Sequence, residues 1–186
     1  MSSDITKRRE HEQSKHIYLT SSPSYGAKNH GQRAYELVQQ IKPKFIVDFG
    51  CGRNNFLQHF RSQGVEGVGI DFAFREADIV AHMHDVPLPS STADLITSFD
   101  ALEHLLPEDV PLVLSEMHRI ATTDANFIFS ICTRPSRIKV KGEGLHPTVQ
   151  PRDWWLKQIS QVGNPSVSPL GYIVGSFHNE KRRHRA

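Results

Sequence analysis

Two acids and two glycines in this chain are spaced as in a site that binds a nucleotide-type ligand. Asp48 closes a short apolar run, Gly50 and Gly52 follow it, and Asp71 lies 19 residues beyond Gly52 (71 − 52). Glycines in a strand-to-helix turn let the backbone approach a ligand closely. An acid about 20 residues further on binds ribose hydroxyls in such sites. The spacing therefore predicts an adenosine-type ligand.

Charge favours a cationic ligand over NAD. A pyrophosphate-binding turn needs a third glycine, and that position is Asn55 here. Asp48 would also repel a pyrophosphate, whereas it would stabilise the ammonium and sulfonium of S-adenosylmethionine. The residues thus favour S-adenosylmethionine, with NAD as the weaker alternative.

Alternating apolar runs predict the elements that must position these residues. We expect a helix ending before Pro43, and Gly64 ends the helix that follows the glycine turn. The expected strands are 44–49, 65–71, 78–83, 93–99 and 126–132, and the later helices are 108–120 and 152–162. This order predicts an α/β fold. The expected fold is a Rossmann-like three-layer sandwich with a mostly parallel sheet, helices on both faces and a short antiparallel C-terminal hairpin.

The length of 186 residues fits one domain. We expect a disordered or loosely attached tail over 1–16, a single domain over 17–178 and a basic tail over 179–186. Within the domain, we assign 17–42 to a lid and first helix, 43–135 to the cofactor-binding core, and 136–178 to a substrate-side loop, a helix and the final strands.

The composition and the charge distribution limit which other classes of protein this chain can belong to. The two cysteines form no disulfide framework or zinc pattern, so no metal site is expected. No apolar run reaches the roughly 18 residues that span a bilayer, and we expect a cytoplasmic protein without membrane insertion. Basic runs at 7–9 and 181–185 are interpreted as solvated tails, with contact to nucleic acid as the alternative. The oligomeric state stays open.

Five ordered motifs resemble the class I S-adenosylmethionine-dependent methyltransferases, particularly the small ubiquinone-biosynthesis-like members, over about residues 30–135. They are DFGCG (48–52), GID (69–71), HMHDVPLPSSTADLI (82–96), SFDALEHL (98–105) and EMHRI (116–120). Asn54 replaces a glycine that is common in the family. The resemblance implies S-adenosylmethionine as cofactor and S-adenosylhomocysteine as product. The expected cofactor-binding residues are Asp48, Gly50, Gly52, Asp71, Phe72, Asp85, Val86, Ser98 and Tyr25.

The candidate catalytic residues follow the fourth strand. His104 is the first candidate for a general base, with Asp100 as an alternative base or substrate anchor. The alternative for His104 is a packing role in the next helix. The segment 98–101 lacks the NPPY-type tetrapeptide of amino-group methyltransferases. We interpret Cys132, after the fifth strand, as a buried, inert thiol.

Two loops combine polar and aromatic side chains suited to an acceptor. One, over 25–31, lies where this fold often has a lid. The other, over 142–155, precedes the last helix. The expected substrate-binding residues are His30, His146, Arg152, Trp154 and Trp155.

We therefore expect an enzyme, a methyltransferase acting on a small polar acceptor through a hydroxyl of a sugar-like compound or metabolite. The alternatives are methylation of nucleic acid or protein by the same fold, and an inactive subunit that binds S-adenosylmethionine.

Overall fold

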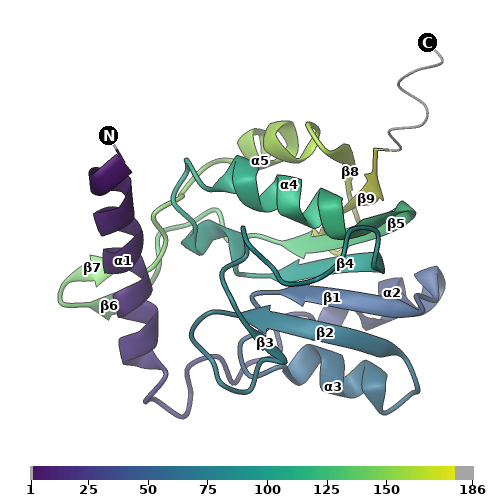
Figure 1. Ribbon diagram of the computed structural model, residues 1–186, viewed down its shortest axis with the longest axis horizontal. Helices are drawn as coiled ribbons and strands as arrows, with labels where there is room; N and C mark the ends of the chain where they lie inside the picture. The colour runs from purple at the N-terminus through teal and green to yellow at the C-terminus, as the bar shows by residue number, and fades with distance from the viewer. Residues whose placement is uncertain (1, 179–186) are drawn as a thin grey trace.

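The structure is a computed structural model that describes residues 2–178, and a seven-stranded sheet forms its centre (Figure 1). The strand order is β3-β2-β1-β4-β5-β9-β8, with β9 antiparallel to both of its neighbours and the other pairs parallel. The strands are β1 (Phe45–Phe49), β2 (Glu66–Asp71), β3 (Ile79–Val80), β4 (Ala93–Phe99), β5 (Ala121–Ser130), β8 (Gly163–Val167) and β9 (Ile173–Phe177).

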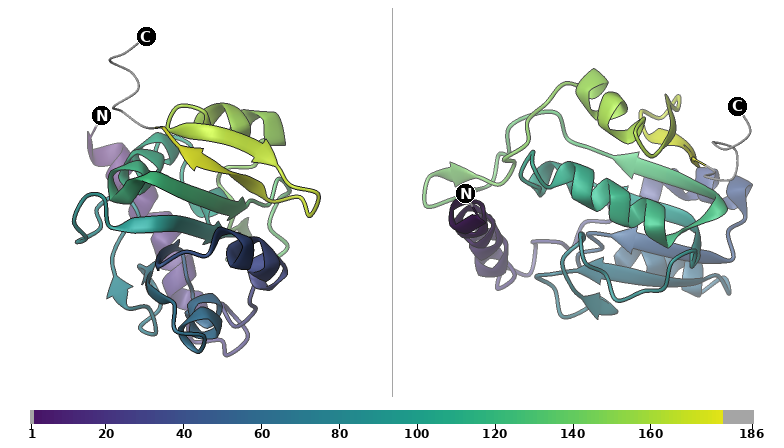
Figure 2. Two further views of the ribbon diagram at one scale, coloured as in Figure 1. Left: turned by 90° about the vertical axis from the view of Figure 1, so that its right-hand side faces the viewer. Right: turned by 45° about the horizontal axis from the view of Figure 1, so that its top comes forward.

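Helices cover both faces of the sheet (Figure 2). On one face α2 and α3 pack against Ile46 and Leu95, and on the other α4 and α5 pack against Val47 and Ile96. Neighbouring residues of a strand point to opposite faces, and both faces of β1 and β4 are covered, so these strands are largely apolar and almost entirely buried. The helices are α1 (Ser2–Leu19), α2 (Tyr35–Ile41), α3 (Asn55–Arg61), α4 (Val110–Ile120) and α5 (Arg152–Ile159), with 3₁₀ turns η1 (Gln32–Ala34) and η2 (Leu102–His104).

The predicted fold class is confirmed, including the antiparallel strands at the C-terminal end of the sheet. Local signals account for several boundaries. Lys42 ends α2 in a left-handed conformation just before Pro43, and Pro111 lies in the first turn of α4, where no amide partner is needed. The third strand is shorter than expected, and β5 begins at Ala121 rather than at 126.

The N-terminal segment differs from the expectation. Residues 1–16 were expected to be disordered or loosely attached, but α1 runs from Ser2 to Leu19. It lies beside the hairpin of β6 (Lys139–Val140) and β7 (Glu143–Gly144), across the end of the sheet where the parallel strands finish (Figures 1 and 2). Nothing in the local sequence indicated this helix, because α1 has no apolar stripe.

Ion pairs with distant parts of the chain hold α1 in place. The Arg9 guanidinium pairs with Asp109, whose side chain is almost fully buried, and Arg8 pairs with Glu108 at 2.6 Å. Lys15 donates to the carbonyl of Gly144 at 3.0 Å. The basic run 7–9 is therefore part of a docked helix, whereas the tail 179–186 lies outside the described residues. Within 2–178 no helix has the length and apolar character needed to cross a membrane.

Candidate functional site

The glycine turn after β1 is held against the end of β2. The amides of Gly50 and Cys51 both donate to the carbonyl of Ile70, at 2.8 and 3.0 Å. Gly50 has φ +75° and Gly52 has φ +55°, and a Cβ on Gly50 would come within 2.4 Å of the Cβ of Ala101. Only glycine fits this position. Asn54, which replaces the family's further glycine, also adopts a left-handed conformation, with φ 61°.

Asp71 joins the end of β2 to that turn. Its carboxylate accepts hydrogen bonds from the amides of Gly52 at 3.0 Å and Ala73 at 2.8 Å. Burial raises the pKa of Asp71 and the backbone amides partly offset this. The carboxylate is thus fixed beside the glycines, where the sequence predicted a ribose-binding acid.

Asp48 is a buried acid beside the same turn. Its Oδ1 accepts a hydrogen bond from the Thr97 hydroxyl at 2.7 Å. Burial, with a smaller contribution from the Asp71 charge, raises the pKa of Asp48 to about 7. A cation nearby would favour the ionised form of Asp48, so the turn suits a positively charged group.

The two acids and the glycine turn line a cavity of about 950 Å³ at the end of the sheet where the parallel strands finish. Its size matches that of sites for cofactors and small molecules. Of the predicted site residues it takes in Tyr25, His30, Asp48, Gly50, Gly52, Asp71, Phe72, Asp100, His104 and His146. The fold therefore brings together residues from the lid segment, the core and the late loop.

His30 and Asp100 form a pair in the cavity wall. The Nδ1 atom of His30 lies 2.6 Å from Oδ2 of Asp100, and the Ser130 hydroxyl donates to Oδ1 of Asp100 at 2.7 Å. Burial alone would raise the pKa of Asp100, but these two hydrogen bonds outweigh it and hold the pKa below its usual range. An ionised Asp100 fixes the ring of His30 and leaves Nε2 free.

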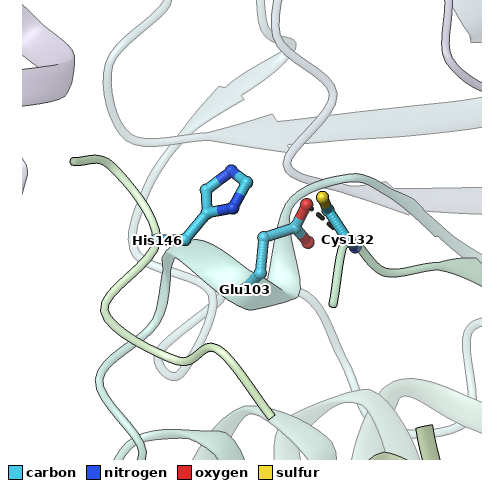
Figure 3. Close-up of side chains that lie close together, drawn as sticks. All are labelled: Glu103, Cys132 and His146. Carbon is cyan, nitrogen blue, oxygen red and sulfur yellow. Dashed lines mark hydrogen bonds between the residues drawn. The ribbon is translucent and has the colours of Figure 1, made fainter. Parts of the chain in front are cut away.

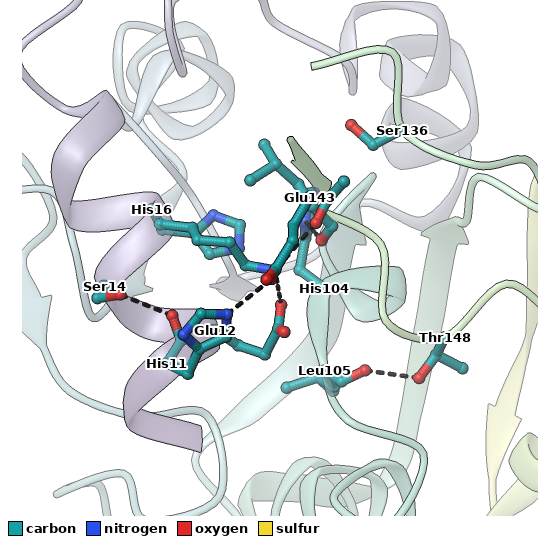
Figure 4. A network of polar contacts seen from close by, with 12 residues as sticks. His11, Glu12, Ser14, His16, His104, Leu105, Ser136, Glu143 and Thr148 are labelled. Atoms are coloured by element: carbon teal, nitrogen blue, oxygen red, sulfur yellow. Dashed lines mark hydrogen bonds and ion pairs between the residues drawn. The ribbon is translucent and has the colours of Figure 1, made fainter. Parts of the chain in front are cut away.

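His104 lies in a more enclosed place, between two other histidines. Its ring packs edge-on against His16 of α1, with 4.7 Å between the ring centroids (Figure 4). It also packs edge-on against His146, with 4.8 Å between the ring centroids. Its Nδ1 atom lies 2.8 Å from the Leu145 carbonyl. Burial lowers the pKa of His104 to about 4, so the ring is neutral at neutral pH and a weak base.

Six of the predicted site residues lie away from the lining of this cavity. The Val86 amide donates to Glu116, Ser98 donates to the Phe49 carbonyl, and Asp85 lies outside. Trp155 is fully buried in the core, and Trp154 packs edge-on against it in α5. This corrects the expectation of substrate contact for Trp155, because its ring fills the space between α5 and the sheet. Arg152 begins α5 and is exposed.

Sequence reasoning missed several residues that line the cavity. His16 and Leu19 belong to α1, whose docking had no signal in the local pattern. Cys132 is partly exposed and lines the cavity, so the expectation of a buried thiol is wrong. Glu103 is also among the residues that border the cavity, and its side chain is fully buried. The E-H pair at 103–104 was visible in the sequence, but nothing local shows that Cys132 comes near it.

The sequence matches a family described as "Methyltransferase domain" over residues 28–165. Among curated proteins it is similar to the malonyl-[acyl-carrier protein] O-methyltransferases of Hamiltonella defensa, at 26% identity over 111 residues, and Yersinia pestis, at 27% over 111 residues. The first match covers 54% of this chain and 42% of the relative, so the matched part spans less than half of the relative's length.

Solved structures share the fold at low sequence identity. One is the Burkholderia thailandensis 1,6-didemethyltoxoflavin-N1-methyltransferase with bound S-adenosylhomocysteine, with TM-score 0.67, 12% identity, and coverage of 91% of this chain and 90% of that one. Another is the sugar N-methyltransferase KedS8 from Streptoalloteichus, with TM-score 0.66, 11% identity, and coverage of 87% and 92%.

Proposed function

Because this chain belongs to the methyltransferase-domain family, we propose that it transfers a methyl group from S-adenosylmethionine to an oxygen atom of a small polar acceptor. One observation carries the choice of acceptor atom. The His30–Asp100 pair lies in the wall of the cavity that the glycine turn and Asp71 also line.

The family match supports the predicted cofactor, S-adenosylmethionine, and the Burkholderia neighbour, which shares the fold, holds S-adenosylhomocysteine. The residues of the cavity fit it. We assign Asp71 to the ribose hydroxyls, Phe72 to the adenine, and Asp48 to the sulfonium and ammonium groups, since all three residues line the cavity.

When bound, S-adenosylmethionine would supply an activated methyl group for the acceptor oxygen, with S-adenosylhomocysteine as the product. His30 takes the acceptor's proton on Nε2, since its Nδ1 atom is held by Asp100. His104 was the first candidate from sequence, but its low pKa makes it the weaker base at neutral pH. We propose that it shapes the cavity instead.

Oxygen is favoured over nitrogen for two reasons. The segment 98–101 reads SFDA rather than an NPPY-type sequence, and a histidine fixed by a carboxylate suits an O–H, whose proton must be removed for attack. The similar curated proteins are named as O-methyltransferases, whereas the two structural neighbours above are named as N-methyltransferases. A sugar-like or metabolite hydroxyl remains our proposal for the acceptor.

Calorimetry with S-adenosylmethionine, S-adenosylhomocysteine and NAD tests the cofactor. We expect binding of the first two and a loss of roughly tenfold or more in affinity for Asp71→Asn, because a side-chain oxygen that accepts hydrogen bonds becomes a donor. Asp124→Asn, the same change at an exposed position of β5, is the control. Tight binding of NAD alone would refute the proposal.

The acceptor is then sought with methyl-labelled S-adenosylmethionine and pools of small hydroxyl and amino compounds. Label transferred to hydroxyl compounds supports the proposal, and transfer only to amines contradicts the choice of oxygen. Transfer to nucleic acid or protein stays the alternative prediction, although Arg8 and Arg9 already pair with Glu108 and Asp109. A cytoplasmic location is likewise proposed from sequence alone.

A further inference from the structure

Three side chains with metal-binding atoms meet at one wall of the cavity. Glu103 comes from η2, Cys132 follows β5, and His146 lies in the loop after β7, and all three line the cavity (Figure 3). A carboxylate oxygen, the thiol sulfur and a ring nitrogen lie within 4.8 Å of one another. Neither the glycine turn nor the His30–Asp100 pair uses them.

Glu103 is buried with half of its carboxylate unsatisfied. Oε1 accepts a hydrogen bond from the Cys132 amide at 3.1 Å, but Oε2 is buried without a hydrogen-bond partner among residues 2–178. A buried carboxylate oxygen without a partner costs free energy unless a proton or a cation satisfies it. A cation bound beside Glu103 would satisfy Oε2 in place of a proton.

A backbone carbonyl holds one ring nitrogen of His146. Its Nδ1 atom lies 2.8 Å from the Arg134 carbonyl, which accepts a hydrogen bond when Nδ1 is protonated. Nε2 then keeps its lone pair, and a backbone carbonyl on the second nitrogen is the usual support of a metal-bound histidine. Thr148 holds this loop to the residue that follows η2, since its hydroxyl donates to the Leu105 carbonyl at 2.6 Å (Figure 4). His146 is thereby kept beside Glu103.

We infer that Glu103, Cys132 and His146 bind a divalent transition-metal ion, and that Zn²⁺ is the best fit. A thiolate, an imidazole and a carboxylate suit Zn²⁺, whereas Mg²⁺ and Ca²⁺ prefer oxygen ligands alone. Zinc–ligand bonds of about 2.0–2.3 Å place tetrahedral ligands roughly 3.5 Å apart, so the atoms must close by about 1 Å. Cys132 and His146 lie in loops and are only partly buried, so they can move by that amount.

Three protein ligands leave a fourth position for a molecule from the cavity. A metal ion there holds an acceptor oxygen and lowers its pKa, which eases loss of its proton. This role rests on the proposed function, and it narrows the acceptor to compounds whose reacting hydroxyl can coordinate a metal. Binding of the ion itself does not depend on that function.

A second cluster offers an internal comparison. His11, Glu12 and Glu143 also bring suitable atoms together, but His11 and Glu143 are exposed and already bond to each other at 2.7 Å. This cluster contains no cysteine, and the carboxylate of Glu143 has an ion-pair partner in Lys15. We therefore do not assign a metal to it.

The test is titration of metal-free protein with Zn²⁺ in competition with a chromogenic chelator, and with Co²⁺ as a spectroscopic probe. We expect one ion per chain and a thiolate-to-cobalt charge-transfer band. Cys132→Ser should abolish the band, and His146→Gln and Glu103→Gln should each weaken Zn²⁺ binding at least roughly tenfold. The controls Cys51→Ser, His118→Gln and His11→Ala should bind as the original protein does, and circular dichroism checks that every variant folds.

Absence of stoichiometric Zn²⁺ binding would overturn the assignment, as would equal affinity in the three ligand variants. Loss of binding in His11→Ala would also overturn it, because the ion would then lie at the second cluster. Calorimetry with S-adenosylmethionine on the same metal-free protein separates the two proposals. Cofactor binding without Zn²⁺ binding refutes the metal site alone, and the reverse result refutes the cofactor site alone.

Discussion

At the scale of single residues, Asp48 links cofactor binding to pH. Burial raises its pKa to about 7, so without a ligand it is largely protonated below that pH. A sulfonium or ammonium group favours the carboxylate and lowers this pKa. Binding then releases a proton from Asp48 at low pH, and affinity rises as the pH rises through about 7.

The expected change in affinity for S-adenosylmethionine between about pH 6 and pH 8 is roughly tenfold. Calorimetry in two buffers of different ionisation enthalpy measures both the affinity and the proton released. In Asp48→Asn the part of this pH dependence that comes from Asp48 should vanish. The ionisation of the ligand itself affects both proteins equally, so it drops out when their affinities are compared. The same pH dependence in the variant would show that Asp48 does not sense the cofactor.

His30 is the residue whose loss should slow the reaction most without loosening the cofactor. For His30→Gln we expect kcat to fall by roughly 10²–10⁴-fold, the usual contribution of a general base, with unchanged affinity for S-adenosylmethionine. Steady-state kinetics with an identified acceptor and calorimetry provide the two readings. His59→Gln, at a ring that stacks on Tyr35 and lies off the cavity lining, is the control. A larger loss in a variant of His104 would restore His104 as the base.

At the scale of elements, two ion pairs of unequal burial help to hold α1 in position. Asp109 is 7% exposed, so removal of its partner Arg9 leaves a nearly buried carboxylate unpaired, whereas both side chains of the Arg8–Glu108 pair are close to half exposed. Loss of the first pair should cost about 1–3 kcal/mol of docking free energy, whereas loss of the exposed second pair should change the docking little.

Hydrogen exchange followed by mass spectrometry tests this difference. In Arg9→Ala the amides of residues 4–19 should exchange at least roughly fivefold faster than in the original protein, since about 1 kcal/mol shifts local opening by that factor. Arg8→Ala should change them little. If both variants exchange alike, the ion pair with Asp109 does not hold the helix.

The central elements could be predicted from sequence because their signals are local. The run before Asp48 is apolar on both faces. Pro43 and the glycines mark the places where helices and strands end. The position of α1 could not be predicted, since its partners lie about 100 residues away and leave no periodic pattern. The same holds for the site. The glycine turn and Asp71 were visible as a motif, whereas the pairing of His30 with Asp100 exists only in three dimensions.

At the scale of the whole molecule, the cavity brings together segments that lie far apart in the chain. Its lining runs from His16 in α1 to His146 in the loop after β7. A ligand there binds only the folded state. Free cofactor at 100 times its Kd should therefore raise the free energy of unfolding by about 2.7 kcal/mol.

Thermal unfolding by circular dichroism should show this as a rise in Tm of roughly 5–10 °C in a single transition. S-adenosylhomocysteine should act in the same way, and NAD should not. Two separate transitions with cofactor, of which only one moves, would mean that α1 and the late loop do not fold as part of the same unit as the sheet.

The two outermost strands of the sheet are poor templates for another chain. The strand at one border, β3, contains two residues, and the strand at the other, β8, includes Pro165, which has no amide hydrogen to donate. Unpaired strand borders are where proteins recruit further strands and aggregate, and short or proline-containing borders suppress this. The chain should thus resist stacking into fibres, and contacts between copies would have to use helices or loops instead.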